Sequence, residues 1–70
     1  MNQAVPANVY TDCTEGDAGV IIASKYAISP KMIQDILNMA KAHNYTPYRH
    51  IMVVKRPNNT FTVIESANEF

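Results

Sequence analysis

The 70-residue chain has very few of the residues that build disulfides, metal sites and phosphate-binding loops. Its only cysteine is Cys13, so no internal disulfide can form, and a lone cysteine is typical of a reducing compartment. Two glycines cannot form a glycine-rich phosphate loop, and the two histidines have no paired spacing with Cys13 that would predict a zinc site. A Cys–His nucleophile pair would also need an orienting group and a pocket. We therefore expect no metal, no cofactor and no enzymatic activity.

Long apolar runs are also missing from the chain. The longest aliphatic run, Val20 to Ala23, is far too short to cross a bilayer. The N-terminal stretch MNQAVPAN has neither a basic start nor an apolar segment, so it does not look like a signal peptide. These absences favour a soluble, cytoplasmic protein without membrane association.

The chain has no excess of charge of either sign. Its formal net charge is zero, which argues against a protein that binds nucleic acid mainly through charge. The charges are nevertheless unevenly spread, because Asp12, Glu15 and Asp17 cluster early. From residue 31 to residue 56 the charged residues are mostly basic, with Lys31, Lys41, Arg49, Lys55 and Arg56 and only Asp35 among them. One face of the folded protein can therefore be modestly basic.

One segment, residues 30–43, has the pattern of an amphipathic helix. Ser29 is a good N-cap, and Pro30 falls at the first helical position, where its missing N–H costs nothing. Asn44 can end the helix in a left-handed conformation, and Pro47 prevents its continuation. The apolar stripe consists of Ile33, Ile36, Leu37 and Ala40.

A β-hairpin is predicted after this helix, with strands at residues 48–56 and 60–66 on either side of Pro57-Asn58-Asn59. A type I turn with Pro57 at its second position places Val54 opposite Phe61, and a two-residue Asn58-Asn59 turn shifts the register. The type I register also pairs Met52 with Val63, Ile51 with Ile64 and His50 with Glu65. In either register both faces carry large apolar groups. One face can pack on the helix, and the other needs a strand, a helix or another subunit.

The N-terminal region carries weaker signals. Residues 1–8 are expected to form a flexible tail, and residues 9–70 a single small domain. Val9 to Thr11 have strand character but are too few for more than an edge strand. Thr14 to Gly19 have the composition of a loop.

Residues 19–26 are compatible with two structures. Val20, Ile21 and Ile22 are β-branched and favour a buried strand, whereas the spacing of Ile22, Ala23 and Tyr26 is helical. A strand here gives a βαββ layer, and a helix gives a winged-helix-like arrangement. The fold class is α+β in both cases.

The helical alternative resembles the helix-turn-helix and winged-helix DNA-binding domains of bacterial and phage regulators. The family pattern has a small residue in the first helix, met by Ala23, an apolar residue in the turn, met by Ile28, and a polar helix start, met by Ser29-Pro30. Ile33 and Ile36 supply the apolar anchors of the second helix. Ala27 stands where the family usually has glycine, and the family's first helix has no counterpart in this chain.

The resemblance implies a small regulator, of phage or bacterial type, that reads DNA with the helix from Ser29 and with the hairpin tip. Side chains of the helix would face the major groove, where amides pair with adenine and lysine reaches guanine or phosphate. These residues are Ser29, Lys31, Gln34 and Asn38. Residues of the hairpin would contact phosphates and fix the register on the duplex. These residues are Arg49, Lys55, Arg56, Asn58 and Asn59.

The alternative is a compact, non-enzymatic module that acts by protein–protein contact, such as a phage-encoded inhibitor or an accessory subunit. Its partner would be a host protein or a second copy of the chain in a homodimer. Methionine forms adaptable contact surfaces, and tyrosine is common at the centre of interfaces. The candidate contact residues are Met32, Met39, Tyr45 and Tyr48.

Overall fold

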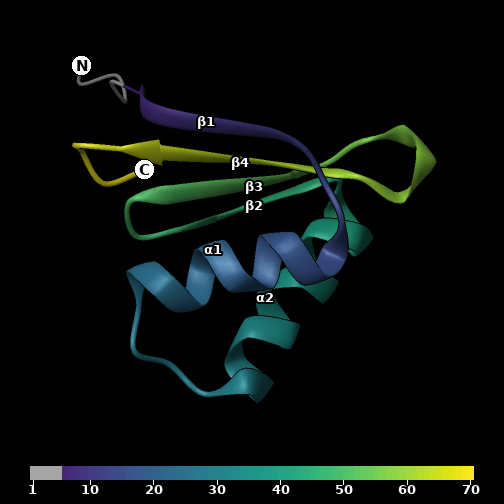
Figure 1. The fold of residues 1–70 in the computed structure, drawn as a ribbon, viewed down its shortest axis with the longest axis horizontal. Helices are drawn as coiled ribbons and strands as arrows, with labels where there is room; N and C mark the ends of the chain where they lie inside the picture. Colours follow the sequence, from purple (N-terminus) through teal and green to yellow (C-terminus); the bar gives the residue numbers. More distant parts are fainter. Residues whose placement is uncertain (1–5) are drawn as a thin grey trace.

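The computed structural model describes residues 6–70, with side chains from Asn8 onward. It contains two helices and a four-stranded antiparallel sheet, which confirms the α+β class. The elements in chain order are β1 Pro6–Cys13, α1 Glu15–Lys25, α2 Pro30–His43, β2 Tyr45–Tyr48, β3 Ile51–Lys55, a short 3-10 turn η1 Pro57–Asn59 and β4 Phe61–Ser66 (Figure 1).

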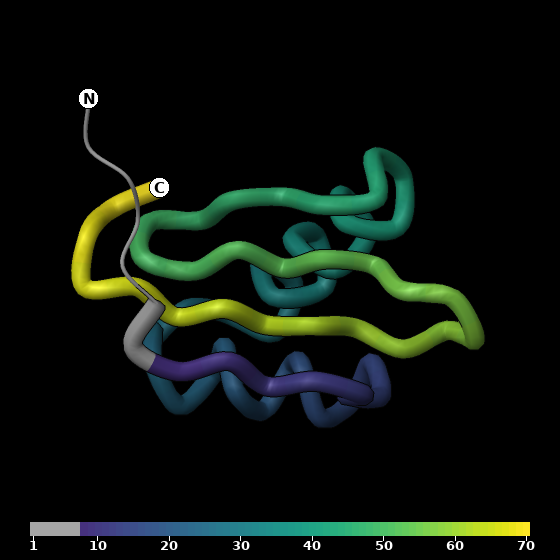
Figure 2. The backbone as a smooth tube through the Cα atoms, turned by 90° about the horizontal axis from the view of Figure 1, so that it is seen from above, coloured from purple at the N-terminus to yellow at the C-terminus, as the bar shows by residue number. Residues whose placement is uncertain are grey.

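The sheet has the strand order β1-β4-β3-β2, so the first strand of the chain pairs with the last. Both helices lie on the same side of this sheet (Figure 1). Figure 2 shows the opposite side, which no helix or strand of residues 6–70 covers. Residues 6–70 therefore form a helical layer and a sheet, and within these residues no second layer covers the other face of the sheet.

Helix α1 includes most of residues 19–26, for which the sequence allows either a strand or a helix. These residues are helical up to Lys25, so the strand alternative is wrong. The expected loop at residues 14–19 is also wrong, because α1 begins at Glu15. The Thr14 hydroxyl accepts a hydrogen bond from Asp17 N at 3.1 Å, and the Asp17 carboxylate accepts one from Thr14 N at 3.5 Å. This capping box starts a helix in a segment whose glycines and acidic residues otherwise favour a turn.

Helix α2 has the bounds that its capping residues predict. The Ser29 hydroxyl accepts from Met32 N at 3.2 Å, and Pro30 occupies the first turn. At the other end, Asn44 adopts the left-handed conformation with φ 72°. The helix therefore begins and ends through local interactions that the sequence reveals.

The segment after α2 forms two strands where the sequence predicts one. Tyr45–Tyr48 form β2, and β3 begins only at Ile51, so the predicted strand at 48–56 is interrupted. Arg49, with φ 54°, lies in the turn between the two strands. Pro47 cannot donate to a strand ladder, and β2 tolerates it because β2 lies at the edge of the sheet.

The register of the β3–β4 hairpin differs from both predicted registers. Asn58 and Asn59 both have positive φ, and Arg56 N donates to Thr60 O at 2.8 Å, so the tip spans three residues. Asparagine tolerates this conformation better than most residues. The resulting pairs are Ile51–Glu65, Met52–Ile64, Val53–Val63, Val54–Thr62 and Lys55–Phe61. This register places the fully buried residues of both strands on the helix-facing side.

Strand β1 is longer than the sequence predicts. Residues 1–5 of the expected tail lie outside the described residues, whereas residues 6–8 already belong to β1. The strand lies at the sheet edge, as expected, and its pairing with β4 shifts register before Asn8 and after Tyr10. Pairing with β4 extends a segment that has little strand propensity of its own.

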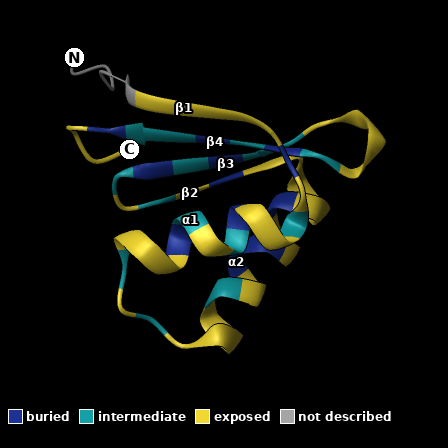
Figure 3. Ribbon diagram, viewed as in Figure 1, coloured by how far each residue is buried: buried dark blue, intermediate teal, exposed yellow. Residues whose placement is uncertain are grey.

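The core lies between the sheet and the two helices. Figure 3 shows that the buried residues concentrate on the central strands and the inner sides of the helices, while β1 is mostly exposed. The largest fully buried side chains are Ile22, Ile51, Val53, Phe61 and Val63. Helix α1 adds Ala18, and α2 adds Ile36, Leu37 and Ala40. The core therefore occupies the helix-facing side of the two central strands β3 and β4.

Gly19 in the middle of α1 offers a stabilising substitution. A Cβ atom at this position would lie 3.6 Å from Ile33 Cγ2 and 3.9 Å from Leu37 Cδ1, which are ordinary contact distances. Glycine costs about 0.5–1 kcal/mol relative to alanine inside a helix. We therefore expect Gly19→Ala to raise the free energy of unfolding by about that amount. Denaturant unfolding measures this change, and a loss of stability would show that α1 and α2 pack more closely than described.

Candidate functional site

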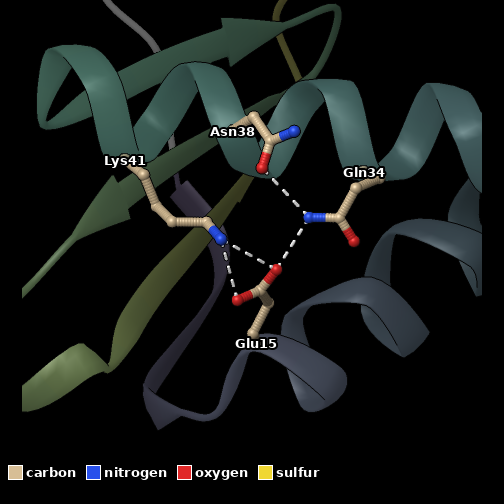
Figure 4. Close-up of polar contacts among 4 residues, drawn as sticks. All are labelled: Glu15, Gln34, Asn38 and Lys41. Carbon is tan, nitrogen blue, oxygen red and sulfur yellow. Dashed lines mark hydrogen bonds and ion pairs between the residues drawn. The ribbon is translucent and has the colours of Figure 1, made fainter.

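The polar side chains on the outer face of α2 interact with the start of α1. Gln34 Nε2 donates to Glu15 Oε2 at 2.8 Å and to Asn38 Oδ1 at 3.1 Å (Figure 4). Lys41 Nζ lies 3.0 Å and 3.1 Å from the two carboxylate oxygens of Glu15. We call Glu15, Gln34, Asn38 and Lys41 the interhelical polar cluster. Two of the side chains expected to read bases are thus already hydrogen-bonded within the protein.

The other residues expected at the start of the reading helix are also engaged. Lys31 forms an exposed ion pair with Asp35, with an N–O distance of 3.3 Å. The Ser29 hydroxyl is used in the N-cap of α2. The carboxylates of Glu15 and Asp35 therefore lie beside the side chains that would approach DNA. Because carboxylates repel phosphates, they oppose such an approach.

Within the interhelical polar cluster, the hydrogen bonds from Gln34 and Lys41, together with the charge of Lys41, hold the pKa of Glu15 below its ordinary value. A depressed folded-state pKa contributes stability above the unfolded pKa, and this contribution is lost as the pH falls through the folded pKa. The cluster therefore stabilises the contact between α1 and α2 at neutral pH.

The lowered pKa of Glu15 predicts that the effect of Glu15→Gln on stability depends on pH. We expect the variant to melt at a lower temperature than the wild type near neutral pH. The difference should shrink as the pH falls below about 4.3, the ordinary value of glutamate, and vanish once the folded-state carboxyl protonates. Thermal melts between neutral and acidic pH measure it. The matched control is Glu69→Gln, which removes an exposed carboxylate near the C-terminus; an equal and constant shift in both variants would contradict the prediction.

The basic residues of the predicted hairpin do not form one surface. Arg49 lies in the turn before β3, whereas Lys55, Arg56, Asn58 and Asn59 lie at or after its end, at the tip that leads to β4. The guanidinium of Arg49 lies 5.5 Å from the ring centre of Tyr26 and 5.2 Å from that of Tyr48. Because β3 separates the two groups, a single stretch of phosphate backbone would have to run the length of the strand to meet both.

The hairpin tip has acidic neighbours. Phe61 pairs with Lys55 on one side and with Cys13 on the other, so the acidic segment around Cys13 lies one strand away from the tip. Lys55 Nζ donates to the Arg56 carbonyl at 2.6 Å, and Asn58 and Asn59 are exposed. Asp12 and Asp17 flank Cys13 closely enough to raise the pKa of its thiol, although burial is the larger cause. The tip is therefore mixed in charge.

The four residues predicted to contact a protein partner fall into three places. Met32 and Met39 are exposed on α2, and Tyr45 is exposed on the edge strand β2. Tyr48 instead packs edge-on against Tyr26, with ring centres 5.2 Å apart. Tyr48 is half-buried and packs against the core, so its side chain contributes to packing where the C-terminal end of α1 meets the sheet.

The side of the sheet opposite the helices carries a continuous set of uncharged, mostly apolar side chains. Val9, Ile64, Met52 and Pro47 pair in register across all four strands, and Thr62, Val54 and Tyr45 form a second row across three of them. Side chains alternate between the two faces of a strand, so these residues point away from the buried Val53 and Val63. We call these seven residues the open sheet face: Val9, Tyr45, Pro47, Met52, Val54, Thr62 and Ile64.

The open sheet face is exposed and has no charged member. Val9 and Tyr45 are 53% and 57% exposed, and the five others are partly or largely exposed. Of its members, only Tyr45 was identified as a contact residue from the sequence. The continuous apolar run Ile51 to Val54 indicates in the sequence that both hairpin faces are apolar, but the sequence does not indicate which residues of β1 and β2 extend the exposed face.

Other kinds of site find little support in residues 6–70. Within this part of the chain no three His, Cys, Asp or Glu side chains gather so that they could hold a metal ion, and no pocket is found. Nor does either of its helices have the length and apolar character needed to cross a bilayer. Cys13 is buried, and its raised pKa keeps the thiol protonated at neutral pH.

Comparison with protein-family models, curated proteins and solved structures finds no match for this chain. Two arrangements are relevant: a polar helix face whose groups are paired with one another, and an apolar sheet face that is left exposed.

Proposed function

We propose that the protein is a non-enzymatic module that acts by protein–protein contact, and that the open sheet face is its contact surface. The observation that supports this most directly is the row Val9, Ile64, Met52 and Pro47, which crosses all four strands on the side without helices. A sheet face with such a row gains free energy when another surface removes it from water.

The composition of the face fits a protein partner better than other partners. The centres of protein interfaces are depleted in charged residues and enriched in aromatic residues and methionine. The open sheet face contains Tyr45 and Met52 and no Lys, Arg, Asp or Glu. The largest contiguous apolar patch on a small monomeric protein is often a functional site. A nucleic acid or an anionic surface would require basic residues that this face does not have.

The DNA-binding regulator stays a prediction from the sequence, and it differs from the proposal in its dependence on salt. A DNA-binding protein loses affinity steeply as salt rises, because it releases counterions from phosphates. The interhelical polar cluster and the Lys31–Asp35 pair leave few free cations on α2, which favours the protein-contact proposal. We expect no retention of a random duplex at low salt. Retention that is lost in Lys31→Glu and Arg56→Glu would favour the regulator.

Site-specific photocrosslinking tests the proposal directly. A photoreactive phenylalanine analogue in place of Thr62 would sit in the middle of the open sheet face, and the same analogue in place of Ala42 would sit on the exposed side of α2. We expect one discrete crosslinked product in the native cells from position 62 and none from position 42. Mass spectrometry identifies the partner.

A charge on the open sheet face provides the control for this experiment. Adding Ile64→Lys should abolish the product at position 62, because a lysine in the centre of an apolar contact is desolvated without a partner. The proposal fails if position 62 gives no product, or if the product is unchanged by Ile64→Lys. It also fails if position 42 gives the same product.

A further inference from the structure

Four side chains gather where the C-terminal end of α1 meets the turn between β2 and β3. Tyr26 and Tyr48 pack edge-on, and the guanidinium of Arg49 lies 5.5 Å from the ring centre of Tyr26 and 5.2 Å from that of Tyr48. Lys25 Nζ lies 5.9 Å from the centre of the same Tyr26 ring. These distances are in the range of cation–π interactions. We call Lys25, Tyr26, Tyr48 and Arg49 the aromatic–basic corner.

The backbone of the turn that carries Arg49 is held by three other parts of the chain. His50 N donates to the Tyr26 hydroxyl at 3.0 Å, at the end of α1. The His50 carbonyl accepts from Ser66 N at 2.8 Å, and the Arg49 carbonyl accepts from Phe70 N at 2.8 Å. Because the turn is fixed and the guanidinium rests against two rings, Arg49 loses less conformational freedom when it binds a partner.

The backbone conformation of Arg49 would suit glycine better than arginine. Its φ of 54° lies in the left-handed region, which a residue with a Cβ atom adopts at a cost in free energy. The other described residues with positive φ are of types that tolerate this region, namely Asp12, Asn44, Asn58 and Asn59. Strained positions cluster at binding sites. The exposed side chain of Arg49 is therefore a candidate for a role in binding.

The two cations of the aromatic–basic corner have no acidic partner among residues 8–70. The ion pairs in this part of the chain are Lys31–Asp35 and the one inside the interhelical polar cluster, and both involve α2. The Glu65 carboxylate accepts hydrogen bonds from side chains of β1, and the exposed Glu69 forms no ion pair with Arg49. Two positive charges around one ring repel each other, and a bound anion would offset this repulsion.

We infer that the aromatic–basic corner binds acidic side chains of a protein partner. This inference rests on the proposed function, because it takes the partner to be a protein, and it adds a contact outside the open sheet face. A guanidinium presents a planar fork of N–H donors that matches a carboxylate through two parallel hydrogen bonds. Arginine and tyrosine are also the residues most enriched among those that dominate binding at protein interfaces.

The corner fits a short acidic segment of a protein better than it fits a nucleic acid. Binding to nucleic acid depends on neutralising several phosphates in succession. The corner offers only Lys25 and Arg49, and the next basic residues of the hairpin, Lys55 and Arg56, lie at the other end of β3. Two adjacent cations match one or two carboxylates of an extended peptide.

NMR titration of the full chain with a hexaglutamate peptide tests the inference, with a hexaglutamine peptide as the neutral control. At about 50 mM salt, we expect the backbone amide signals of Tyr26, Arg49, His50 and Phe70 to shift and to saturate with a dissociation constant of about 0.1–1 mM. Hexaglutamine should leave these signals unchanged, because its amides carry no charge.

Matched arginine variants locate the contact. Arg49→Asn should weaken hexaglutamate binding about tenfold or more, and asparagine accepts the left-handed conformation of the turn. Arg56→Asn makes the same change at the exposed hairpin tip and should leave the affinity unaltered. Arg49→Lys should also weaken binding, because lysine keeps the charge but lacks the planar fork. If Arg49→Asn disturbs the fold, Lys25→Gln at the exposed end of α1 replaces it.

Three results would overturn the inference: no shift at the corner with hexaglutamate, equal losses in Arg49→Asn and Arg56→Asn, or full affinity in Arg49→Lys. A hexathymidylate that binds the same amides more tightly than hexaglutamate would overturn it as well, since the corner would then prefer phosphates. Each of these results leaves the photocrosslinking at position 62 unaffected. A partner captured there would still support the open sheet face after the corner had failed.

Discussion

Phe61→Ala is expected to leave the protein largely unfolded under conditions in which the wild type is folded. Phe61, on the central strand β4, is 1% exposed and is the largest fully buried side chain. It packs in the core between the sheet and the helices. Removing a buried phenylalanine costs about 3–5 kcal/mol through lost burial and the cavity that remains. A single core in a domain of this length rarely supplies more than about 3–5 kcal/mol in total. The loss therefore equals most of the available stability.

The measurement is denaturant unfolding followed by far-ultraviolet circular dichroism. Phe70→Ala is the matched control, because Phe70 is 41% exposed near the C-terminus. We expect its effect to stay within about 0.5 kcal/mol, as for most surface substitutions. Equal losses in the two variants would mean that the core is not where the structure places it.

Ile22→Asp is expected to have a still larger effect. Ile22 has no exposed surface, and it packs in the core from the middle of α1. The loss of its side chain alone costs about 2–5 kcal/mol. The new carboxylate adds a further penalty, because no cation among the core residues can pair with it. We therefore expect no folded population of this variant at neutral pH.

The control for Ile22→Asp lies two residues earlier on the same helix. Val20 is 68% exposed, so Val20→Asp places the same charge in water. We expect Val20→Asp to remain folded, with a change of about 0.5 kcal/mol or less. One-dimensional proton NMR distinguishes dispersed from collapsed spectra for both variants. If Val20→Asp unfolds and Ile22→Asp does not, the orientation of α1 is wrong.

The position of α1 determines what the outer face of α2 can do. When residues 19–26 are helical, the sequence alone suggests a free row of polar side chains for reading a groove. In the fold, Glu15 at the start of α1 accepts hydrogen bonds from Gln34 and Lys41, so this row becomes part of a helix–helix contact. Because both helices lie on one side of the sheet, no helix or strand among residues 6–70 covers its opposite side. We therefore propose the open sheet face, and not the outer face of α2, as the binding surface.

Local chemistry allowed the ends of α2 to be predicted. Ser29 caps the helix, Pro30 lies in its first turn and Asn44 ends it, because each of these roles depends on the residue and its immediate neighbours. The β3–β4 hairpin was also predicted from its β-branched residues and Pro57, although its first strand starts later than expected. The register of this hairpin was not predicted. Asn58 and Asn59 are both left-handed, so the tip spans three residues and the pairing differs by one position from that of either predicted turn.

The candidate site was predictable only in part. The sequence indicates that both faces of the hairpin are apolar and that one of them needs a further layer. It does not indicate that the strands β1 and β2 extend this face to four strands, because Val9 and Pro47 join it only through pairing with distant residues. Tyr48 is the opposite case. The sequence predicts it as a partner contact, but in the fold its ring packs against Tyr26.

The sequence by itself determined the α+β class, the capped helix α2 and the hairpin of β3 and β4, because caps, turns and side-chain alternation act over a few residues. Only the tertiary structure decided that the lead-in to α2 is a helix, that β1 pairs with β4, and that both helices cover the same side of the sheet. These choices depend on contacts between segments far apart in the chain, whose free energy exceeds the small differences in local propensity. They determine which apolar face remains exposed.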